Sequence, residues 1–235
     1  MNLLSLGGNF KTAKNLKAGW ISAELSLAPA NASGYNVCPN ASPGCKAACI
    51  GWFSSRNVFQ PARDAKIRKT KLFFEDRPEF MRLLVEDLEY LERKSKRDKL
   101  PVCIRLNCYS DIAWESIGFK EGSDHWPHIM SKFPEFKFYD YTKLLKRANR
   151  NMMPSNYHLT FSRSEVNHKY LVSFRHDYPA ANIAVVFSGP LPETYLSRKV
   201  INGDVNDLRF LDPKGVIVGL SAKGAGKKDQ SGFIV

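Results

Sequence analysis

Alternating and helical patterns of apolar residues divide this chain into short strands separated by helices. Residues 20–28 alternate apolar and polar side chains, as a half-buried strand does. Residues 182–188 form an almost continuous apolar run, which is typical of a central strand in a parallel sheet. Residues 58–74 and 78–95 carry apolar side chains at helical spacing. The remaining predicted strands are 102–107, 136–141, 157–162, 199–202 and 216–220, and the remaining predicted helices are 126–132, 142–149 and 164–176, the last with Ser164 as its N-cap.

Strands that alternate with helices in this way indicate an α/β protein with a parallel sheet. Because the crossovers between parallel strands share one hand, they would curl the sheet into a partial (β/α) barrel with mostly parallel strands. The chain contains no internal repeat and no low-complexity linker. We therefore expect residues 1–235 to form a single α/β domain, with a cysteine loop at residues 38–49.

Composition is ordinary for a soluble globular protein, with 43% hydrophobic and 25% charged residues. The first residues lack the basic and apolar regions of a signal peptide, and no apolar run approaches the roughly 18 residues of a membrane span. These features predict a cytoplasmic protein without membrane contact, whose thiols stay reduced.

The formal net charge of +12 favours an anionic partner, such as nucleic acid or a nucleotide. The basic residues are spread along the chain, with modest concentrations at 63–71, 93–99, 143–150 and 223–228. Runs of this kind are usually solvated helix faces. The charge therefore predicts a class of partner, and the sequence says nothing of the oligomeric state.

Three of the five cysteines, Cys38, Cys45 and Cys49, have the spacing C-x6-C-x3-C in a loop bent by prolines and a glycine. Clustered thiolates are soft ligands that select zinc, Cu(I) or an iron–sulfur cluster. Structural zinc usually takes four ligands from two close pairs, whereas this loop offers one triplet and no histidine. Three thiolates can hold a [4Fe–4S] cluster and leave one iron open, and this is the ligand set we expect.

Other interpretations of the cysteines stay open. Zinc could be bound with a fourth ligand from elsewhere, or the thiols could form a disulfide or bind no metal. Cys103 lies inside a predicted strand and is expected in the core, whereas Cys108 opens the following loop and could be a fourth ligand. Three ligands would indicate chemistry at an open iron, and four would indicate structure or electron transfer.

The cysteine loop resembles that of radical S-adenosylmethionine (SAM) enzymes, although their usual spacing is the tighter C-x3-C-x2-C. In that fold the cluster loop follows the first strand of the barrel, as residues 38–49 follow the strand predicted at 20–28. The resemblance implies that the open iron takes the amino and carboxylate groups of SAM.

A second resemblance is carried by residues 27–31, 34–49, 69–78, 105–107, 110–115 and 208–212. Through these runs nearly the whole chain resembles a phage-encoded family of unsettled activity, the gene product 88 family. Membership would imply the cytoplasm of an infected host cell.

Polar side chains stand at the ends of most predicted strands, where the functional groups of α/β barrels gather. If the radical SAM resemblance holds, Asn107, Asp140 and Ser162 are candidates for contacts to SAM. Arg105 and Arg163 could hold a carboxylate bidentately, or form ordinary salt bridges. The leading hypothesis is thus a radical SAM-like iron–sulfur enzyme. The alternative is a non-enzymatic phage metalloprotein, containing iron–sulfur or zinc, that binds host nucleic acid or protein.

Overall fold

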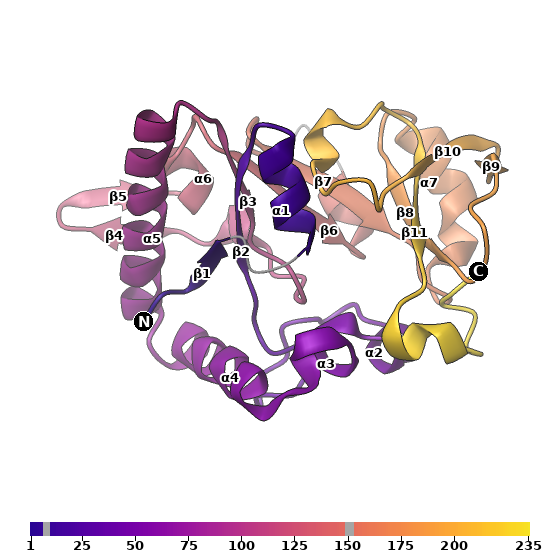
Figure 1. The fold of residues 1–235 in the computed structure, drawn as a ribbon, viewed down its shortest axis with the longest axis horizontal. Helices are drawn as coiled ribbons and strands as arrows, with labels where there is room; N and C mark the ends of the chain where they lie inside the picture. The colour runs from indigo at the N-terminus through magenta and orange to yellow at the C-terminus, as the bar shows by residue number, and fades with distance from the viewer. Residues whose placement is uncertain (7–9, 149–152) are drawn as a thin grey trace.

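A mostly parallel sheet forms the centre of the computed structural model, which describes residues 1–6, 10–148 and 153–235 (Figure 1). Within these residues the sheet has nine strands in the order β1-β2-β3-β6-β7-β8-β11-β10-β9. Strands β2, β3, β6, β7, β8 and β11 run parallel and follow one another in chain order. The strands are β1 (Leu4–Leu6), β2 (Ile21–Leu25), β3 (Val102–Arg105), β6 (Lys137–Thr142), β7 (Tyr157–Ser162), β8 (Ile183–Phe187), β9 (Thr194–Tyr195), β10 (Arg198–Asn202) and β11 (Ile217–Ser221).

The sheet is open rather than a closed barrel. Its two edges are formed by β1, which pairs antiparallel with β2, and by β9, which pairs antiparallel with β10. A separate hairpin of β4 (Phe119–Glu121) and β5 (Asp124–Trp126) lies outside α5. The prediction of an α/β protein with mostly parallel strands is therefore confirmed.

Helices cover the sheet, and others lie along the ends of its parallel strands (Figure 1). The α-helices are α1 (Phe10–Lys17), α2 (Pro43–Ala47), α3 (Ile50–Phe53), α4 (Gln60–Glu75), α5 (Arg77–Asp98), α6 (Ile129–Lys132) and α7 (Leu171–Asp177). The 3-10 turns are η1 (Ser55–Val58), η2 (Trp114–Ser116), η3 (Leu145–Ala148), η5 (His168–Tyr170), η6 (Arg209–Leu211) and η7 (Gly224–Lys228). No helix in the described ranges is long and apolar enough to cross a membrane.

Alternation along the strands gives the sheet two different faces. Ile104 and Phe138 belong to the largest core cluster, which includes the buried stripe of α5 with Leu84. Cys103 points to the opposite face, where it packs in a smaller cluster with Tyr139. Cys103 is fully buried, so the prediction that it belongs to the core is confirmed.

Three predicted helices differ from the structure, and the one predicted at 126–132 begins only at Ile129, because Trp126 belongs to strand β5. Residues 142–149 were expected to be helical, but the chain forms only the 3-10 turn η3, and residue 149 lies outside the described residues. The helix expected from Ser164 begins as α7 at Leu171, and Ser164 does not cap it. The Ser164 backbone N–H instead donates to Asn167 Oδ1 at 2.7 Å, because an asparagine side chain can replace a helical backbone acceptor.

Candidate metal centre at the cysteine loop

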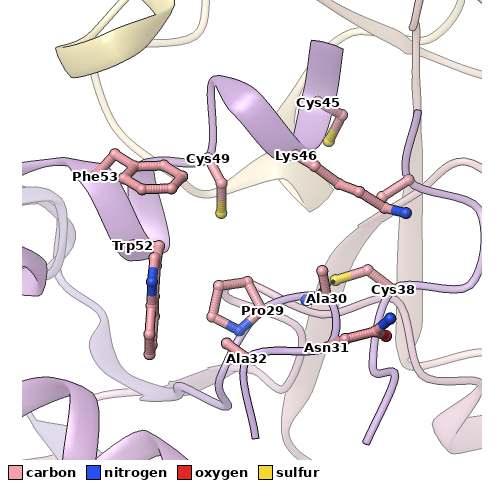
Figure 2. A pocket seen from close by; sticks show the side chains of 11 residues that line it. Pro29, Ala30, Asn31, Ala32, Cys38, Cys45, Lys46, Cys49, Trp52 and Phe53 are labelled. Carbon is pink, nitrogen blue, oxygen red and sulfur yellow. Dashed lines mark hydrogen bonds between the residues drawn. The ribbon is translucent and has the colours of Figure 1, made fainter. Parts of the chain in front are cut away.

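The cysteine loop leaves the carboxyl end of β2 and returns along that edge of the sheet through α2, α3 and α4 (Figure 1). Cys38, Cys45 and Cys49 line a single cavity of about 260 Å³, called here the cysteine cavity. Figure 2 shows Cys45 and Cys49 directing their sulfur atoms into this cavity from one side, with Cys38 opposite. The other lining residues are Pro29, Ala30, Asn31, Ala32, Ala41, Lys46, Trp52 and Phe53.

The short helix α2 is fixed at its N-terminus by two side chains. Ser42 caps it, since its Oγ accepts from the Cys45 N–H at 3.2 Å, and Pro43 follows in the first turn. Glu165, from the segment after β7, accepts from the Gly44 N–H at 2.8 Å and from Ser42 Oγ at 2.7 Å. These contacts hold Cys45 in place from a part of the chain 120 residues away.

The loop that follows β3 holds Cys38. The Cys38 thiol donates to the Tyr109 carbonyl at 3.2 Å and accepts from the Ala30 N–H at 3.5 Å. The Asp111 N–H donates to the Val37 carbonyl at 2.8 Å. The first parallel strand and its neighbour therefore both position this thiol.

Burial shapes the electrostatics of the cavity. It raises the pKa of Cys38 to about 12, and it also raises the pKa of Cys49. Both groups are therefore neutral thiols at pH 7 in the metal-free protein. A metal that binds here must displace their protons, because thiolates are the ligands.

The thiols surround the cavity rather than converging on one point. Across the described part of the chain, no group of three or more His, Cys, Asp or Glu side chains is arranged to hold a metal ion. Cys108 lies outside the lining of the cysteine cavity, and its thiol donates to Glu24 Oε2 at 3.4 Å. The geometry thus brings together the three predicted cysteines and leaves Cys108 apart.

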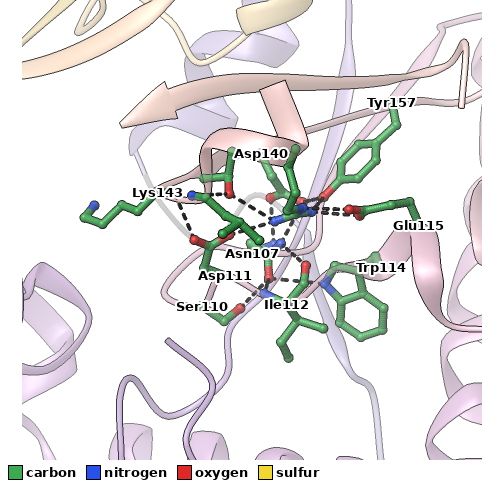
Figure 3. Close-up of polar contacts among 12 residues, drawn as sticks. Asn107, Ser110, Asp111, Ile112, Trp114, Glu115, Asp140, Lys143 and Tyr157 are labelled. Carbon is green, nitrogen blue, oxygen red and sulfur yellow. Dashed lines mark hydrogen bonds and ion pairs between the residues drawn. The ribbon is translucent and has the colours of Figure 1, made fainter. Parts of the chain in front are cut away.

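Two of the predicted cofactor residues lie in a buried polar network, with Asn107 just beyond the end of β3 and Asp140 within β6 (Figure 3). The Asn107 Oδ1 accepts from Ser110 Oγ at 2.7 Å, and the Asn107 Nδ2 donates to the Ile112 carbonyl at 2.9 Å. The Asn107 Oδ1 also accepts from the Ile112 N–H and from the Trp114 indole N–H. We call this set the Asn107 network. It folds residues 107–115 into the loop that holds Cys38.

Asp140 and Arg147 complete the Asn107 network. Asp140 accepts from the Asn107 N–H at 2.7 Å and from Tyr157 OH at 2.8 Å, and burial raises its pKa to about 7. Arg147 pairs with Asp111 and Glu115, at 2.7 Å to each. Every polar side chain named here has a partner inside the protein.

The other predicted cofactor residues lie apart from the cysteine cavity lining and also have protein partners. Ser162 Oγ accepts from Lys143 Nζ at 2.9 Å. Arg105 pairs with Asp207 at 2.9 Å, which is the salt bridge that the sequence left open. Arg163 Nη1 donates to the carbonyls of Gly232 and Phe233, at 2.5 and 2.7 Å. Their predicted contacts to a cofactor stay predictions.

Sequence patterns alone missed three residues that build the site. Glu165 anchors α2 as described above, and Lys66 donates to the Gly51 carbonyl of α3 at 2.6 Å. Tyr109 packs so closely on Gly51 that an added Cβ there would lie 2.3 Å from its ring. Of these contacts only the need for a small residue at position 51 had a signal in the sequence, which is the glycine itself, directly before Trp52 and Phe53.

The comparisons with known proteins give one match. A family model described as Gene product 88 matches residues 2–235. No curated protein and no solved structure matches the chain.

Proposed function

The chain belongs to the gene product 88 family, and we propose that it is an iron–sulfur enzyme of the radical SAM type. In this proposal Cys38, Cys45 and Cys49 bind a [4Fe–4S] cluster. The observation that carries it is that three thiols from one loop line a single cavity at the carboxyl edge of a parallel sheet. Functional groups of α/β proteins gather at this edge.

The arrangement of the thiols supports a cluster over a single ion. Thiolates on one zinc ion converge on a point, whereas those of a cubane bind different irons and stand around its volume. The three thiols line one cavity from two sides, so each could bind a different iron of a cluster placed in it (Figure 2). The separate position of Cys108 supports three protein ligands and one open iron.

Strand order supports the finer fold assignment. Five parallel strands, β2, β3, β6, β7 and β8, lie side by side in chain order, and the cysteine loop follows the first of them. A partial (β/α) barrel of the radical SAM type has such a run. The order reverses only beyond β8, where β11 lies between β8 and the parallel strand β10, and this reversal is far from the cysteine loop in the strand order.

The protein's own groups would bind, orient and exclude water. A bound cluster would supply one electron for the cleavage of SAM, whose amino and carboxylate groups its open iron would take. Pro29, Trp52 and Phe53 give the cavity apolar walls that limit water near the cluster. Asn107 and Asp140 would act by holding the loop behind Cys38, because their hydrogen bonds are already made within the protein.

Ser162, Arg105 and Arg163 keep their predicted roles toward SAM or a substrate carboxylate. Arg105 carries the best argument of the three, since its Nε has no hydrogen-bond partner among the described residues. A buried guanidinium N–H of this kind favours an acceptor oxygen.

Anaerobic reconstitution with iron and sulfide tests the proposal. We expect brown protein with about four irons and four sulfides per chain, and a low-temperature EPR signal of the reduced protein that shifts when SAM is added. Colourless protein with stoichiometric zinc would contradict the cluster. A cluster-containing protein whose EPR signal does not change when SAM is added would contradict the assignment as a radical SAM enzyme.

A second candidate function is a metalloprotein that binds nucleic acid through the surface beside the cysteine cavity. Exposed apolar side chains follow Cys49 directly, with Phe53 at 47% and Phe59 at 63% exposure, and Arg56 between them is also exposed. Turn η7, the yellow turn beside α3 in Figure 1, adds exposed Lys227 and Lys228. Aromatic rings interleaved with cations suit stacked bases and phosphates.

Fluorescence anisotropy with a labelled single-stranded oligonucleotide tests this second function. We expect binding that weakens steeply between low and moderate salt, and that weakens in a Phe53→Ala, Phe59→Ala double variant. The exposed side chain of Tyr90 on α5 offers a matched control, as Tyr90→Ala. No binding at low salt would remove nucleic acid as the partner.

A further inference from the structure

A buried lysine stands behind the cysteine cavity. Lys66 on α4 is 5% exposed, and its ammonium donates to the Gly51 carbonyl and to Asn57 Oδ1, at 2.6 Å to each. The rings of Trp52 and Tyr109 lie beside it, with centroids 5.7 and 5.3 Å from Nζ. The charge is therefore held by two neutral oxygens and two aromatic faces.

Lys66 lacks the carboxylate partners of two other cations at the carboxyl end of the sheet, since Arg105 pairs with Asp207 and Arg147 pairs with two carboxylates. Arg163 is also buried and bonds to carbonyl oxygens, but it lies apart from the lining of the cysteine cavity. Lys66 has no carboxylate within ion-pair distance among the described residues. Its hydrogen bond to the Gly51 carbonyl places it two residues along the chain from Cys49, which lines the cysteine cavity.

An uncompensated buried charge is expensive. Burial of an ammonium without a carboxylate partner disfavours its charged form. The two oxygens and two aromatic faces around Lys66 offset part of this cost, and negative charge arriving at the cysteine cavity would offset more. Thiolates bound to a metal cluster supply that charge, because the protons of the thiols leave when the metal binds.

We propose that Lys66 is the counter-charge of a net anionic, thiolate-bound cluster in the cysteine cavity, and that it acts as a positioning residue through Gly51. This inference rests on the proposed function. One-electron reduction adds a negative charge to the cluster, so a fixed cation nearby favours the reduced state. The low dielectric of the buried site strengthens this effect.

A purely structural role for Lys66 predicts a different result. If Lys66 only ties α3 to α4, its loss would lower stability and leave the reduction potential of a loaded cluster unchanged. The potential is therefore the decisive readout, because it depends on charge and not on how firmly the helix is held.

The test compares reconstituted wild type with Lys66→Met, Lys66→Gln, Lys66→Arg and the control Lys69→Met. Lys69 lies on the same helix and also donates to a backbone carbonyl, that of Leu3 at 2.6 Å, whereas Lys66 donates to the Gly51 carbonyl of α3. Lys69→Met therefore controls for the loss of a lysine hydrogen bond at another position. An EPR-monitored redox titration gives the potential of each protein. Lys66→Gln keeps one N–H donor without the charge, and Lys66→Arg keeps the charge.

We expect both neutral variants of Lys66 to lower the ratio of reduced to oxidised cluster tenfold at a fixed potential, a shift of about 59 mV for one electron. Lys66→Arg and Lys69→Met should stay close to wild type. Loaded Lys66→Gln with the wild-type potential would overturn the role of Lys66 and leave the proposed function standing. A wild type that takes up no iron and sulfide would overturn the proposed function, and the Lys66 inference with it.

Discussion

The cysteine cavity and the Asn107 network are joined by one loop but use their polar atoms in opposite ways. In the Asn107 network, the Asn107 Oδ1 accepts three hydrogen bonds, and Arg147 is paired with two carboxylates. In the cysteine cavity, three thiols stand around a space with mostly apolar walls, and the buried cation behind them has no carboxylate partner among the described residues. One region satisfies its polar groups internally, while the other leaves three thiols facing a cavity.

The difference separates structural from binding roles. A buried polar group whose hydrogen bonds are complete within the protein adds order and stability, and offers little to a ligand. A group of soft ligands around a cavity gains most of its interactions only when something binds. Substitutions should therefore have different effects in the two regions. Those in the cysteine cavity should abolish metal binding, and those in the Asn107 network should lower the free energy of unfolding.

The largest effect should come from the three cysteines. Each of Cys38→Ala, Cys45→Ala and Cys49→Ala should lose the cluster almost completely, because three ligands hold it. The free energy of unfolding of the metal-free protein should change by only about 1 kcal/mol, as for a substitution that breaks no buried network. Iron and sulfide analysis with chemical denaturation measures both, and Cys103→Ala is the control that should keep the cluster. Full iron content in any of the three variants would show that its thiol is not a ligand.

Arg147→Met should give the converse result. It leaves the carboxylates of Asp111 and Glu115 buried without their cation, so we expect the free energy of unfolding to fall by about 3–5 kcal/mol. The folded fraction should still bind the cluster. The exposed neighbour Lys146, changed to Met, is the control and should have little effect in urea denaturation. A loss below about 1 kcal/mol for Arg147→Met would remove the structural role of the network.

Local patterns predicted the elements that build the sheet. Strand β7 was predicted with its observed bounds, and helices α4 and α5 were found within a few residues, because long periodic runs reflect burial directly. The cysteine triplet was found because three thiols in one loop are rare unless they act together. Pro43 and Gly44 begin the short helix α2, which carries Cys45 to the common cavity.

Long-range partners could not be predicted from the same patterns. Asn107 and Asp140 lie near the ends of the strands predicted at 102–107 and 136–141, as cofactor-binding residues often do, and nothing near them in sequence indicates that they bond to each other. Glu165 and Lys66 reach the cysteine loop from distant segments, and such contacts are set by the tertiary fold. The N-terminal elements β1 and α1 were missed because their runs are short.

The Asn107 network should also give stability a dependence on pH. Burial raises the pKa of Asp140 to about 7, so the folded protein keeps this proton to a higher pH than the unfolded chain, where the ordinary value is 3.8. The contribution of Asp140 is therefore greatest below pH 3.8 and falls as the pH rises to about 7, by roughly 2–4 kcal/mol. Asp140→Asn cannot ionise and should lack this decline. Urea midpoints of both proteins from pH 4 to 8 measure it, and parallel profiles would show that Asp140 is ionised throughout.

The smallest expected effect concerns Cys108, which lies between the two regions. Its thiol donates to Glu24 Oε2 at 3.4 Å and its backbone N–H donates to the Leu25 carbonyl, so it faces β2 and not the cavity. Cys108→Ala should keep the iron content, the EPR spectrum and the response to SAM of the wild type. A fourth ligand would behave differently, because its removal would open the site or leave a three-iron cluster.

The response of the wild type to SAM must be measured beside the variant. An unchanged spectrum of Cys108→Ala shows only that Cys108 is not a ligand, and it does not show whether SAM binds. If three thiols hold the cluster, the wild-type EPR signal shifts with SAM and Cys108→Ala reproduces the shift. If Cys108 moves to the cluster on loading, the wild type ignores SAM and the variant responds to it. The second pattern would require the bond from Cys108 to Glu24 to break, and would assign the cysteine cavity to structure or electron transfer instead of catalysis.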